Sequence, residues 1–359
     1  MKTPKSRQNP EIKAFILKSI EDHPQAVGAL VAEKFQISRT AAGRYLKRLE
    51  TDGLIEGEGK TSARRYVLKP VVHEEAVIQL TPDMYESEVW EKHFAALTKD
   101  LPKNVADICY YGFTEIFNNA IDHSESETAL VQYDQYATKI VLSVTDRGVG
   151  IFAKIQRDFK LADPRAALLE LSKGKLTSDP KRHSGEGIFF TSRMFNTFGI
   201  LSGNLYYSRS MLEDDDGWGW LIDSKDRPES APGTFVQMEI NLDADWTTKA
   251  VFDKFQNEDM DFAKTHVPVF LARFGQEQLV SRSQAKRILA RFDKFEEVML
   301  DFRGVPEIGQ AFADEIFRVY QNAHPEIKIV TIGVSEDVQK MIDRSRRSNP
   351  TSPADGPIE

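Results

Sequence analysis

Three short segments combine acids, amides and glycines in a way that suits a cation and a phosphate-bearing ligand. They are residues 115–123 (EIFNNAIDH), 146–150 (DRGVG) and 185–187 (GEG). On a helix, Glu115, Asn119 and Asp122 fall at positions i, i+4 and i+7, so they form one polar stripe backed by apolar side chains. A carboxylate and a carboxamide one turn apart can hold a hydrated Mg²⁺ and polarise a water molecule beside a phosphate. The spacing therefore predicts Asn119 as a Mg²⁺ ligand and Glu115 as a general base.

The second segment follows an apolar run. Residues 140–145 predict a strand, so Asp146 lies at a strand end, where its carboxylate can accept a hydrogen bond from the amino group of a base. Gly148 and Gly150 have no side chain and let the backbone approach the ligand closely. We therefore expect this segment to bind the base of a nucleotide.

The third segment is expected at the start of a helix. Gly185 and Gly187 precede the helical run 188–198, and free backbone N–H groups together with the helix dipole favour phosphate at such a position. The polar stretch 173–183 contains the glycine, proline and basic residues that suit a mobile lid over a triphosphate, although most charged loops are simply solvated. The candidate contacts of the terminal phosphate in this lid are Lys175, Lys181 and Arg182.

The order and spacing of the three segments resemble the N, G1 and G2 boxes of the GHKL ATPase superfamily. Its members include gyrase, heat-shock chaperone ATPases, sensor histidine kinases and anti-sigma-factor serine kinases. Gly233-Thr234, before the apolar run 235–240, is similar to the Gly-Thr that closes the adenine pocket in that family. The resemblance implies an α/β sandwich that binds ATP, with Mg²⁺ on Asn119 and adenine on Asp146. The third box is shorter than the glycine-rich box of many members.

Composition narrows the classes of protein. A chain of 359 residues is expected to form two or three domains with sizeable cores. The single cysteine, Cys109, excludes a disulfide framework and a cysteine-cluster metal site, and it lies in the apolar run that leads to Glu115. No apolar run approaches transmembrane length and the N-terminus lacks the apolar core of a signal peptide, so we expect a cytoplasmic protein without membrane contact.

Charge is distributed unevenly along the chain. Residues 1–70 hold 14 Lys and Arg against 8 Asp and Glu, a net charge of +6, which leaves −14 for the remainder of a chain with a net charge of −8. A basic end on an acidic protein indicates contact with nucleic acid.

The pattern within residues 1–70 predicts three helices followed by two strands. The expected elements are helices at 10–23, at 26–35 and from the Ser38 N-cap to Asp52-Gly53, then strands at 54–55 and 66–68 around a turn with Gly57 and Gly59. The segment 37–55 resembles the recognition helix and wing entry of winged-helix transcription regulators. The implied base contacts are Ser38, Arg39, Thr40 and Arg44, and the implied phosphate contacts of the wing are Lys60, Arg64 and Arg65. A winged helix used only for protein contacts is the alternative, and the local positive charge favours DNA.

The central part of the chain contains further elements. The expected ones are a strand at 76–80, helices at 85–97, 151–159 and 164–172, and strand segments within 201–222. The helix at 85–97 serves either as a dimer arm or, as we favour, in core packing. The segment 70–75 either couples the basic end to the rest or tethers it flexibly.

From about residue 243, strands alternate with helices, which predicts a small α/β layer. The expected elements are strands at 268–274, 297–302 and 328–331 and helices at 283–293, 308–322 and 336–344. The segment 298–317 resembles the STAS-like domain found behind bacterial GHKL modules. Phosphorylatable STAS domains carry a Ser or Thr at the start of the helix after this strand, whereas Gly309-Gln310-Ala311 has no hydroxyl group.

Together these patterns predict an α+β multidomain protein. The expected units are a winged helix-turn-helix at 1–70, a GHKL α/β sandwich at 71–242, a STAS-like α/β domain at 243–344 and a disordered tail at 345–359. The favoured function is an ATP-binding, Mg²⁺-dependent ATPase that binds DNA as a homodimer and meets a protein partner at the STAS-like domain. The alternatives are a serine/threonine protein kinase of the anti-sigma-factor type and a scaffold that binds ATP without hydrolysing it.

Overall fold

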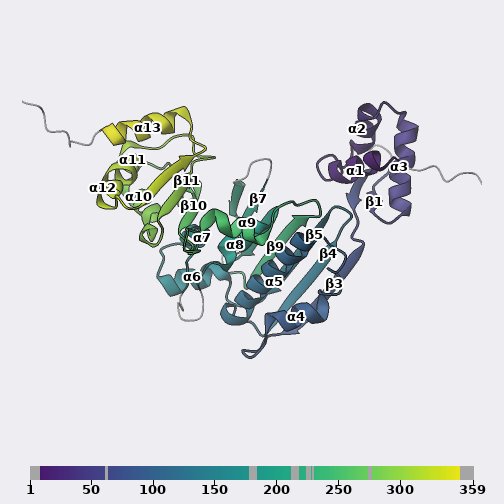
Figure 1. The fold of residues 1–359 in the computed structure, drawn as a ribbon, viewed down its shortest axis with the longest axis horizontal. Coiled ribbons are helices and arrows are strands. Elements are labelled where there is room, and N and C mark those ends of the chain that lie inside the picture. Colours follow the sequence, from purple (N-terminus) through teal and green to yellow (C-terminus); the bar gives the residue numbers. More distant parts are fainter. Residues whose placement is uncertain are drawn as a thin grey trace, which may run out of the picture.

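The fold is mixed α/β, with sheets of two, three and seven strands among the residues that the structure describes (Figure 1). The computed structural model describes residues 9–60, 64–177, 184–211, 218–223, 228, 230–273 and 277–347, with backbone alone for 218–223. Among the described helices, none has the length and apolar character needed to span a bilayer.

The N-terminal unit has three helices and a two-stranded antiparallel hairpin. Its elements are α1 (Pro10–Ser19), α2 (Val27–Lys34), α3 (Arg39–Thr51), β1 (Ile55–Glu58) and β2 (Arg65–Leu68). The Ser38 hydroxyl caps α3 by accepting a hydrogen bond from the Ala41 amide at 3.1 Å, as the sequence predicts. Gly57 was expected in the turn and instead pairs with Tyr66 within the hairpin. Apolar side chains of the three helices form a core of their own, which includes Ile16, Val31 and Leu49.

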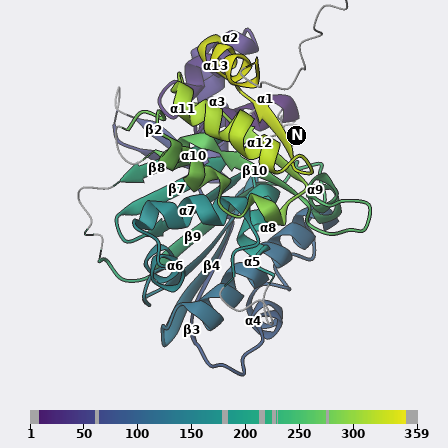
Figure 2. The ribbon, with the colours of Figure 1, turned by 90° about the vertical axis from the view of Figure 1, so that its left-hand side faces the viewer.

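The central unit is a seven-stranded, entirely antiparallel sheet with helices on one face. Its strands are β3 (Val72–Gln79), β4 (Thr128–Gln135), β5 (Lys139–Asp146), β6 (Thr197–Ser202), β7 (Leu205–Ser210), β8 (Trp218–Asp223) and β9 (Thr234–Asn241), in the order β3-β4-β5-β9-β6-β7-β8. Its helices are α4 (Glu86–His93), α5 (Lys103–His123), α6 (Ile151–Phe159), α7 (Pro164–Lys173), α8 (Gly187–Met194) and α9 (Thr248–Phe255). Burial alternates along β9, and α5 and α8 pack on the buried face (Figure 2).

Two boundaries in the central unit differ from expectation. Helix α8 ends at Met194, and the chain enters β6 at Thr197, although a helix was expected up to 198. Pairing of β6 with β9 overrides the local helical pattern. Strand β3 begins at Val72, four residues earlier than expected, and the Val71 amide donates to the Gln135 carbonyl at 2.7 Å. The segment expected as a possible tether is therefore largely part of the sheet.

The C-terminal unit is a three-stranded parallel sheet with β11 in the centre. Its elements are β10 (Lys264–Pro268), the 3₁₀ turn η2 (Val269–Ala272), α10 (Arg282–Leu289), the 3₁₀ turn η3 (Phe292–Lys294), β11 (Glu297–Asp301), α11 (Gln310–Asp314), the π-helical stretch η4 (Glu315–Tyr320), α12 (Gln321–Ala323), β12 (Lys328–Ile332) and α13 (Glu336–Arg347). The strand expected at 268–274 is wrong, because Pro268 ends the strand and a 3₁₀ turn follows. Helix α13 also continues past 344, so Ser345 is buried in it and not in a tail; residues 348–359 lie outside the described residues.

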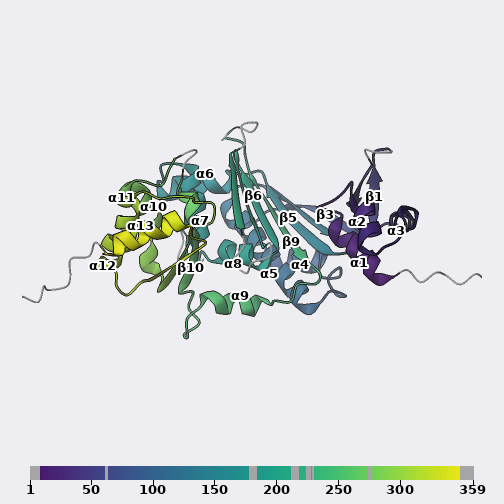
Figure 3. The ribbon, with the colours of Figure 1, turned by 90° about the horizontal axis from the view of Figure 1, so that it is seen from above.

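The N-terminal and C-terminal units lie at opposite ends of the central sheet (Figure 3). The N-terminal unit meets the sheet where β5 begins and β9 ends. There the buried Lys139 ammonium lies 2.5 Å from the Glu21 carboxylate and 2.9 Å from that of Glu239. Lys18 pairs with Asp243 at 3.1 Å beside this contact. The basic end of the chain is thus docked on the sheet.

Candidate functional site

One cavity of about 330 Å³ opens between α5, α6, α8 and the adjoining ends of β5 and β9. Residues from all three chemistry-bearing segments line it, although these segments lie far apart in the sequence. The predicted site residues in its wall are Glu115, Asn119, Asp146, Gly185, Gly187 and Thr234. Asp122, the third member of the predicted stripe, does not belong to the lining.

Glu115 is half-buried on α5 and lies against the start of α8. Burial raises the pKa of its carboxyl group, the acids Glu86 and Glu186 act in the same direction, and a hydrogen bond from Tyr111 opposes them. A Cβ atom built on Gly187 would stand 2.0 Å from Glu115 Oε2, so a larger residue at 187 would require the carboxylate to move. A carboxylate with a raised pKa at a cavity wall suits general-base chemistry.

Asp146 ends β5 and is held by a short chain of hydrogen bonds. Its Oδ1 accepts from the Gly148 amide at 2.9 Å, and the Thr234 hydroxyl accepts from the Ile151 amide at 2.9 Å. Burial raises the pKa of Asp146, while hydrogen bonds from Gly148 and Thr234 oppose this shift. The carboxylate is therefore oriented before any ligand enters.

Gly148 and Gly150 do not line the cavity but allow the backbone to cross behind it. A Cβ atom on Gly148 would lie 1.8 Å from the Ser124 carbonyl oxygen, and Gly150 has a φ of +79° at the start of α6. The Gly233 amide donates to the Gly148 carbonyl at 2.7 Å, which ties the Gly-Thr pair to this crossing. These two glycines are needed for chain packing around the site rather than for direct contact with its contents.

Asn118 and Lys154 line the cavity but were not predicted as site residues. Asn118 lies beside Asn119, and within the described residues neither carboxamide has a hydrogen-bond partner. A strict i, i+4, i+7 stripe leaves Asn118 out, whereas the cavity takes in a wider arc of α5. Lys154 on α6 is the only lysine in the described lining, and its ammonium lies 3.0 Å from the Asp158 carboxylate.

Of the predicted basic lid at residues 173–183, the structure describes only residues 173–177. Lys181 and Arg182 lie outside the described residues. Lys175 donates to the Lys294 carbonyl at 3.0 Å and faces the rings of Phe262 and Phe295, so it binds the C-terminal unit. Lys173, expected in the lid, is the buried last residue of α7.

The residues predicted to contact DNA differ in whether they form ion pairs within the protein. Arg39, Arg44 and Lys60 are exposed, and within the part of the chain that the structure describes they form no ion pair. Ser38 and Thr40 are also exposed at the start of α3. By contrast, Arg64 pairs with Glu50 at 2.8 Å and Arg65 with Glu58 at 2.7 Å, so both are partly neutralised. Within the described residues, no group of three or more His, Cys, Asp and Glu is arranged to hold a metal ion.

Comparison with known proteins bears on the C-terminal unit. Residues 284–339 match the model of a STAS-like domain of unknown function (DUF4325). We therefore call the C-terminal unit, which contains this matched segment, the STAS-like domain. No curated protein matches the chain.

The STAS-like domain carries a buried polar group at the carboxyl ends of its strands. His266 Nε2 lies 3.1 Å from Asp301 Oδ2, and the Arg303 guanidinium lies 2.6 Å from the same oxygen. Burial by itself raises the pKa of Asp301, but hydrogen bonds from His266 and Arg303 outweigh it and lower this pKa to about 2. Gly309, the N-cap residue of α11, donates its amide to the Leu279 carbonyl at 2.7 Å.

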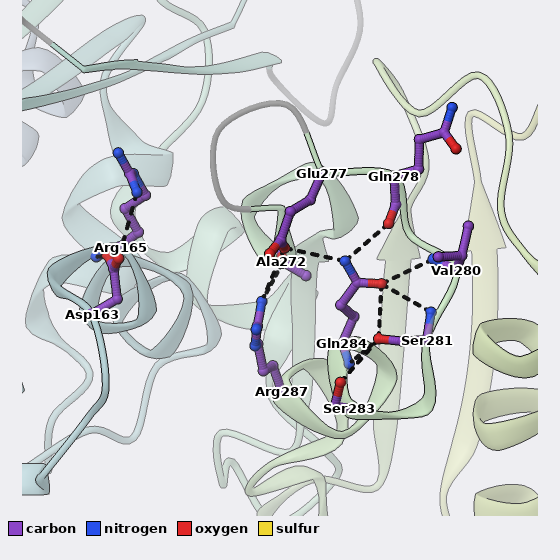
Figure 4. Close-up of polar contacts among 10 residues, drawn as sticks. All are labelled: Asp163, Arg165, Ala272, Glu277, Gln278, Val280, Ser281, Ser283, Gln284 and Arg287. Atoms are coloured by element: carbon purple, nitrogen blue, oxygen red, sulfur yellow. Dashed lines mark hydrogen bonds and ion pairs between the residues drawn. The ribbon is translucent and has the colours of Figure 1, made fainter.

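Helix α10 of the STAS-like domain is anchored at its start by Gln284 (Figure 4). The Gln284 amide oxygen accepts from the backbone amides of Val280 and Ser281, both at 2.9 Å. Its amide nitrogen donates to Glu277 at 3.1 Å and to the Gln278 carbonyl at 2.9 Å. This buried side chain is fully hydrogen-bonded, so its role is structural.

Proposed function

We propose that the chain is an ATP-binding DNA regulator with a GHKL ATPase domain at its centre. The observation that carries the proposal is the single cavity that gathers Glu115, Asn119, Asp146, Gly187 and Thr234 from distant parts of the sequence. A volume of about 330 Å³ fits a nucleotide-sized ligand.

Each end of the cavity has its own chemistry. Asp146, already oriented by Gly148 and Thr234, would accept a hydrogen bond from the amino group of adenine. The N-terminus of α8 faces the phosphates. The carboxamide of Asn119, which has no partner among the described residues, would hold Mg²⁺ through its oxygen, which fits a cation that prefers oxygen ligands and keeps several waters. Bound Mg²⁺ supplies neutralisation of phosphate charge, and Glu115 accepts the proton of the attacking water.

The N-terminal unit is proposed to be a winged helix that binds DNA as part of a homodimer. Support comes from Arg39 and Arg44 on α3, which are exposed and form no ion pair with any described residue, and from the net charge of +6 on residues 1–70. In this arrangement α3 enters the major groove and Lys60 reaches a phosphate from the hairpin. The pairs formed by Arg64 and Arg65 make these two residues weaker contacts than Lys60.

A protein kinase of the anti-sigma-factor type is the second candidate, because a STAS-like domain stands in the same chain as the cavity. The helix start Gly309-Gln310-Ala311 has no hydroxyl group, so the acceptor would be on another protein.

One experiment separates these functions. Purified protein is incubated with Mg²⁺ and γ-labelled ATP, with and without DNA, and the label is followed. Release of labelled phosphate supports the ATPase, and transfer of label to an added STAS protein supports the kinase. ATP binding without turnover supports the scaffold, and absence of ATP binding refutes all three.

A further inference from the structure

The end of helix α7 is bound by the STAS-like domain through a buried cluster of charges. The Lys173 ammonium contacts the Glu170 carboxylate at 2.7 Å and the carbonyls of Arg287 and Ala290 at 3.0 and 2.9 Å. These carbonyls belong to the last turn of α10, where the helix dipole favours a cation. Burial lowers the pKa of Lys173 to about 8, against the opposing effect of Glu170.

Arg291 completes this cluster and also binds backbone. One guanidinium nitrogen lies 2.7 Å from Glu170 Oε2, and another donates to the Gly174 carbonyl at 2.6 Å. Arg291 has a φ of +65°, in the left-handed region that residues with a side chain rarely adopt. Such strain persists where surrounding contacts hold it, and it occurs often at functional positions.

Gly174 begins a short structure that we call the loop base, consisting of Gly174–Leu176 and Gly185–Gly187. The Leu176 amide donates to the Gly185 carbonyl at 3.2 Å, which joins its two halves. A Cβ atom on Gly174 would lie 2.6 Å from the Phe262 ring, so this residue is tightly packed. Leu176, Gly185 and Gly187 line the cavity, so a shift of Gly174 moves the cavity wall.

On the STAS-like side, helix α10 is held in place by hydrogen bonds at both of its ends. The Arg287 guanidinium binds the Ala272 carbonyl at 3.3 Å and Glu277 at 3.4 Å, and Gln284 anchors the start of the same helix (Figure 4). The opposite end of the cavity is held differently. Asp146 and Thr234 are positioned by the central sheet and by Gly148, without a contact from the STAS-like domain among the described residues.

We propose that Arg291 of the STAS-like domain is a positioning residue for the phosphate end of the nucleotide cavity. It acts through Gly174 and the loop base, so the domain sets the affinity for phosphates and leaves recognition of the base unchanged. This inference rests on the proposed ATP site. If Arg291 has this role, a partner protein that displaces Arg291 from Gly174 would regulate ATP binding.

The test compares ATP with adenosine in the full-length chain. Arg291→Met removes two charge-assisted hydrogen bonds, so we expect ATP affinity to fall roughly tenfold or more. Adenosine affinity, followed by ligand-observed NMR, is expected to stay unchanged. Arg291→Lys keeps the charge beside Glu170 without the forked contact, and it should recover part of the ATP affinity.

Arg318→Met is the matched control, since Arg318 pairs with Asp314 inside the STAS-like domain and does not touch α7 among its described contacts. It should bind both ligands as the parent does. If Arg291→Met and Arg291→Lys bind ATP as tightly as the parent, or lose ATP and adenosine equally, the positioning role is wrong. A parent protein that binds neither ligand refutes the proposed function itself, and this inference with it.

Discussion

Glu115 and Asn119 stand one turn apart on α5, but their surroundings differ. Burial raises the pKa of Glu115, and Tyr111 hydrogen-bonds to it, whereas within the described residues the Asn119 carboxamide has no partner. A buried polar group without a partner is costly, and Asn119 avoids this cost by facing the cavity. The two side chains are therefore suited to different tasks, proton transfer and ligand binding.

Asn119→Ala is expected to weaken ATP binding in Mg²⁺ by roughly tenfold or more, because an oxygen ligand is lost from a cation that requires near-octahedral geometry. Calorimetric titration with and without EDTA measures the effect, which should vanish in EDTA. Asp107→Ala is the control, since Asp107 is exposed on the same helix and pairs only with Lys103 among its described contacts. Equal Mg²⁺-dependent affinity in Asn119→Ala and the parent would exclude Asn119 as a ligand.

Glu115→Gln is expected to keep ATP binding and to lose hydrolysis by roughly 100-fold or more, because an amide cannot accept the proton of water. Activity requires the ionised carboxylate. Since the pKa of Glu115 is raised above 4.5, the parent rate should fall with acidification at a higher pH than an exposed glutamate would give. A pH profile of the turnover number checks this, and a Glu115→Gln enzyme that works at the parent rate would remove Glu115 from the mechanism.

At the scale of elements, helix α3 presents its charges to solvent. Arg39→Glu with Arg44→Glu should abolish specific DNA binding and leave ATP turnover without DNA intact. Because the double reversal also replaces two positive charges near the DNA phosphates with negative ones, residual non-specific binding should be weaker and show a flatter salt dependence. Anisotropy titrations at several salt concentrations measure this, with Lys340→Glu on α13 as the control. A double variant that binds DNA as the parent does would show that α3 is not the DNA contact.

Asp301, the last residue of strand β11 in the STAS-like domain, is a buried carboxylate whose ionisation affects stability in acid. The pKa of Asp301 is depressed from 3.8 to about 2 when folded, so its contribution is complete above about pH 4 and is lost as the pH falls towards 2. This contribution is about 2 kcal/mol, from the pKa difference. Asp301→Asn should therefore be less stable at pH 7 and less sensitive to acid between pH 4 and 2. Urea unfolding at several pH values tests this, and parallel pH curves for both proteins would contradict it.

Local sequence patterns predicted many of the helices and strands correctly. Where the predictions were wrong, contacts between residues distant in the sequence determine the structure. Helix α6 begins and ends where the sequence predicts, because it follows a glycine and has a clear amphipathic period. Phe198 was expected in a helix, but pairing with Met238 places it in β6. Lys173 was expected in the lid but is buried against the carbonyls of Arg287 and Ala290. These residues lie more than one hundred positions later in the chain, so no local pattern indicates the contact.

The same limit applies to the candidate site. Glu115, Asn119 and Asp146 could be predicted as candidates because acids and amides at helical spacing or at a strand end stand out locally, and all three line the cavity. Asn118 was missed because its inclusion depends on how far the cavity extends around α5. The contact between Arg291 and Gly174 joins two units of the chain, and no local pattern marks it.

At the scale of the whole molecule, β5 and β9 connect the cavity to the docked N-terminal unit. Asp146 and Thr234 lie at one end of these paired strands, and Lys139 with Glu239 lies at the other, bound to Glu21. Two strands of eight residues can transmit a shift over roughly 25 Å. The docking contact is thus a physical link between the cavity and the N-terminal unit.

We expect Glu115→Gln saturated with ATP to bind a palindromic DNA site with an affinity that differs from the nucleotide-free form by roughly fivefold or more. By linkage, that DNA must alter ATP affinity by the same factor. Adding Lys139→Met, which removes the contact to Glu21, should reduce the difference. Labelled DNA titrated against each form decides the matter, since superimposable isotherms would mean that the nucleotide does not control DNA binding.

The only cysteine, Cys109, is completely buried on α5 beneath the sheet, and burial raises the pKa of its thiol. A thiol of this kind does not react with alkylating reagents while the fold is closed. Its rate of modification therefore reports how often the central core opens. Cys109 can therefore serve as a built-in probe of unfolding. A second cysteine introduced at the surface for a fluorophore would be labelled selectively, without first removing the native one.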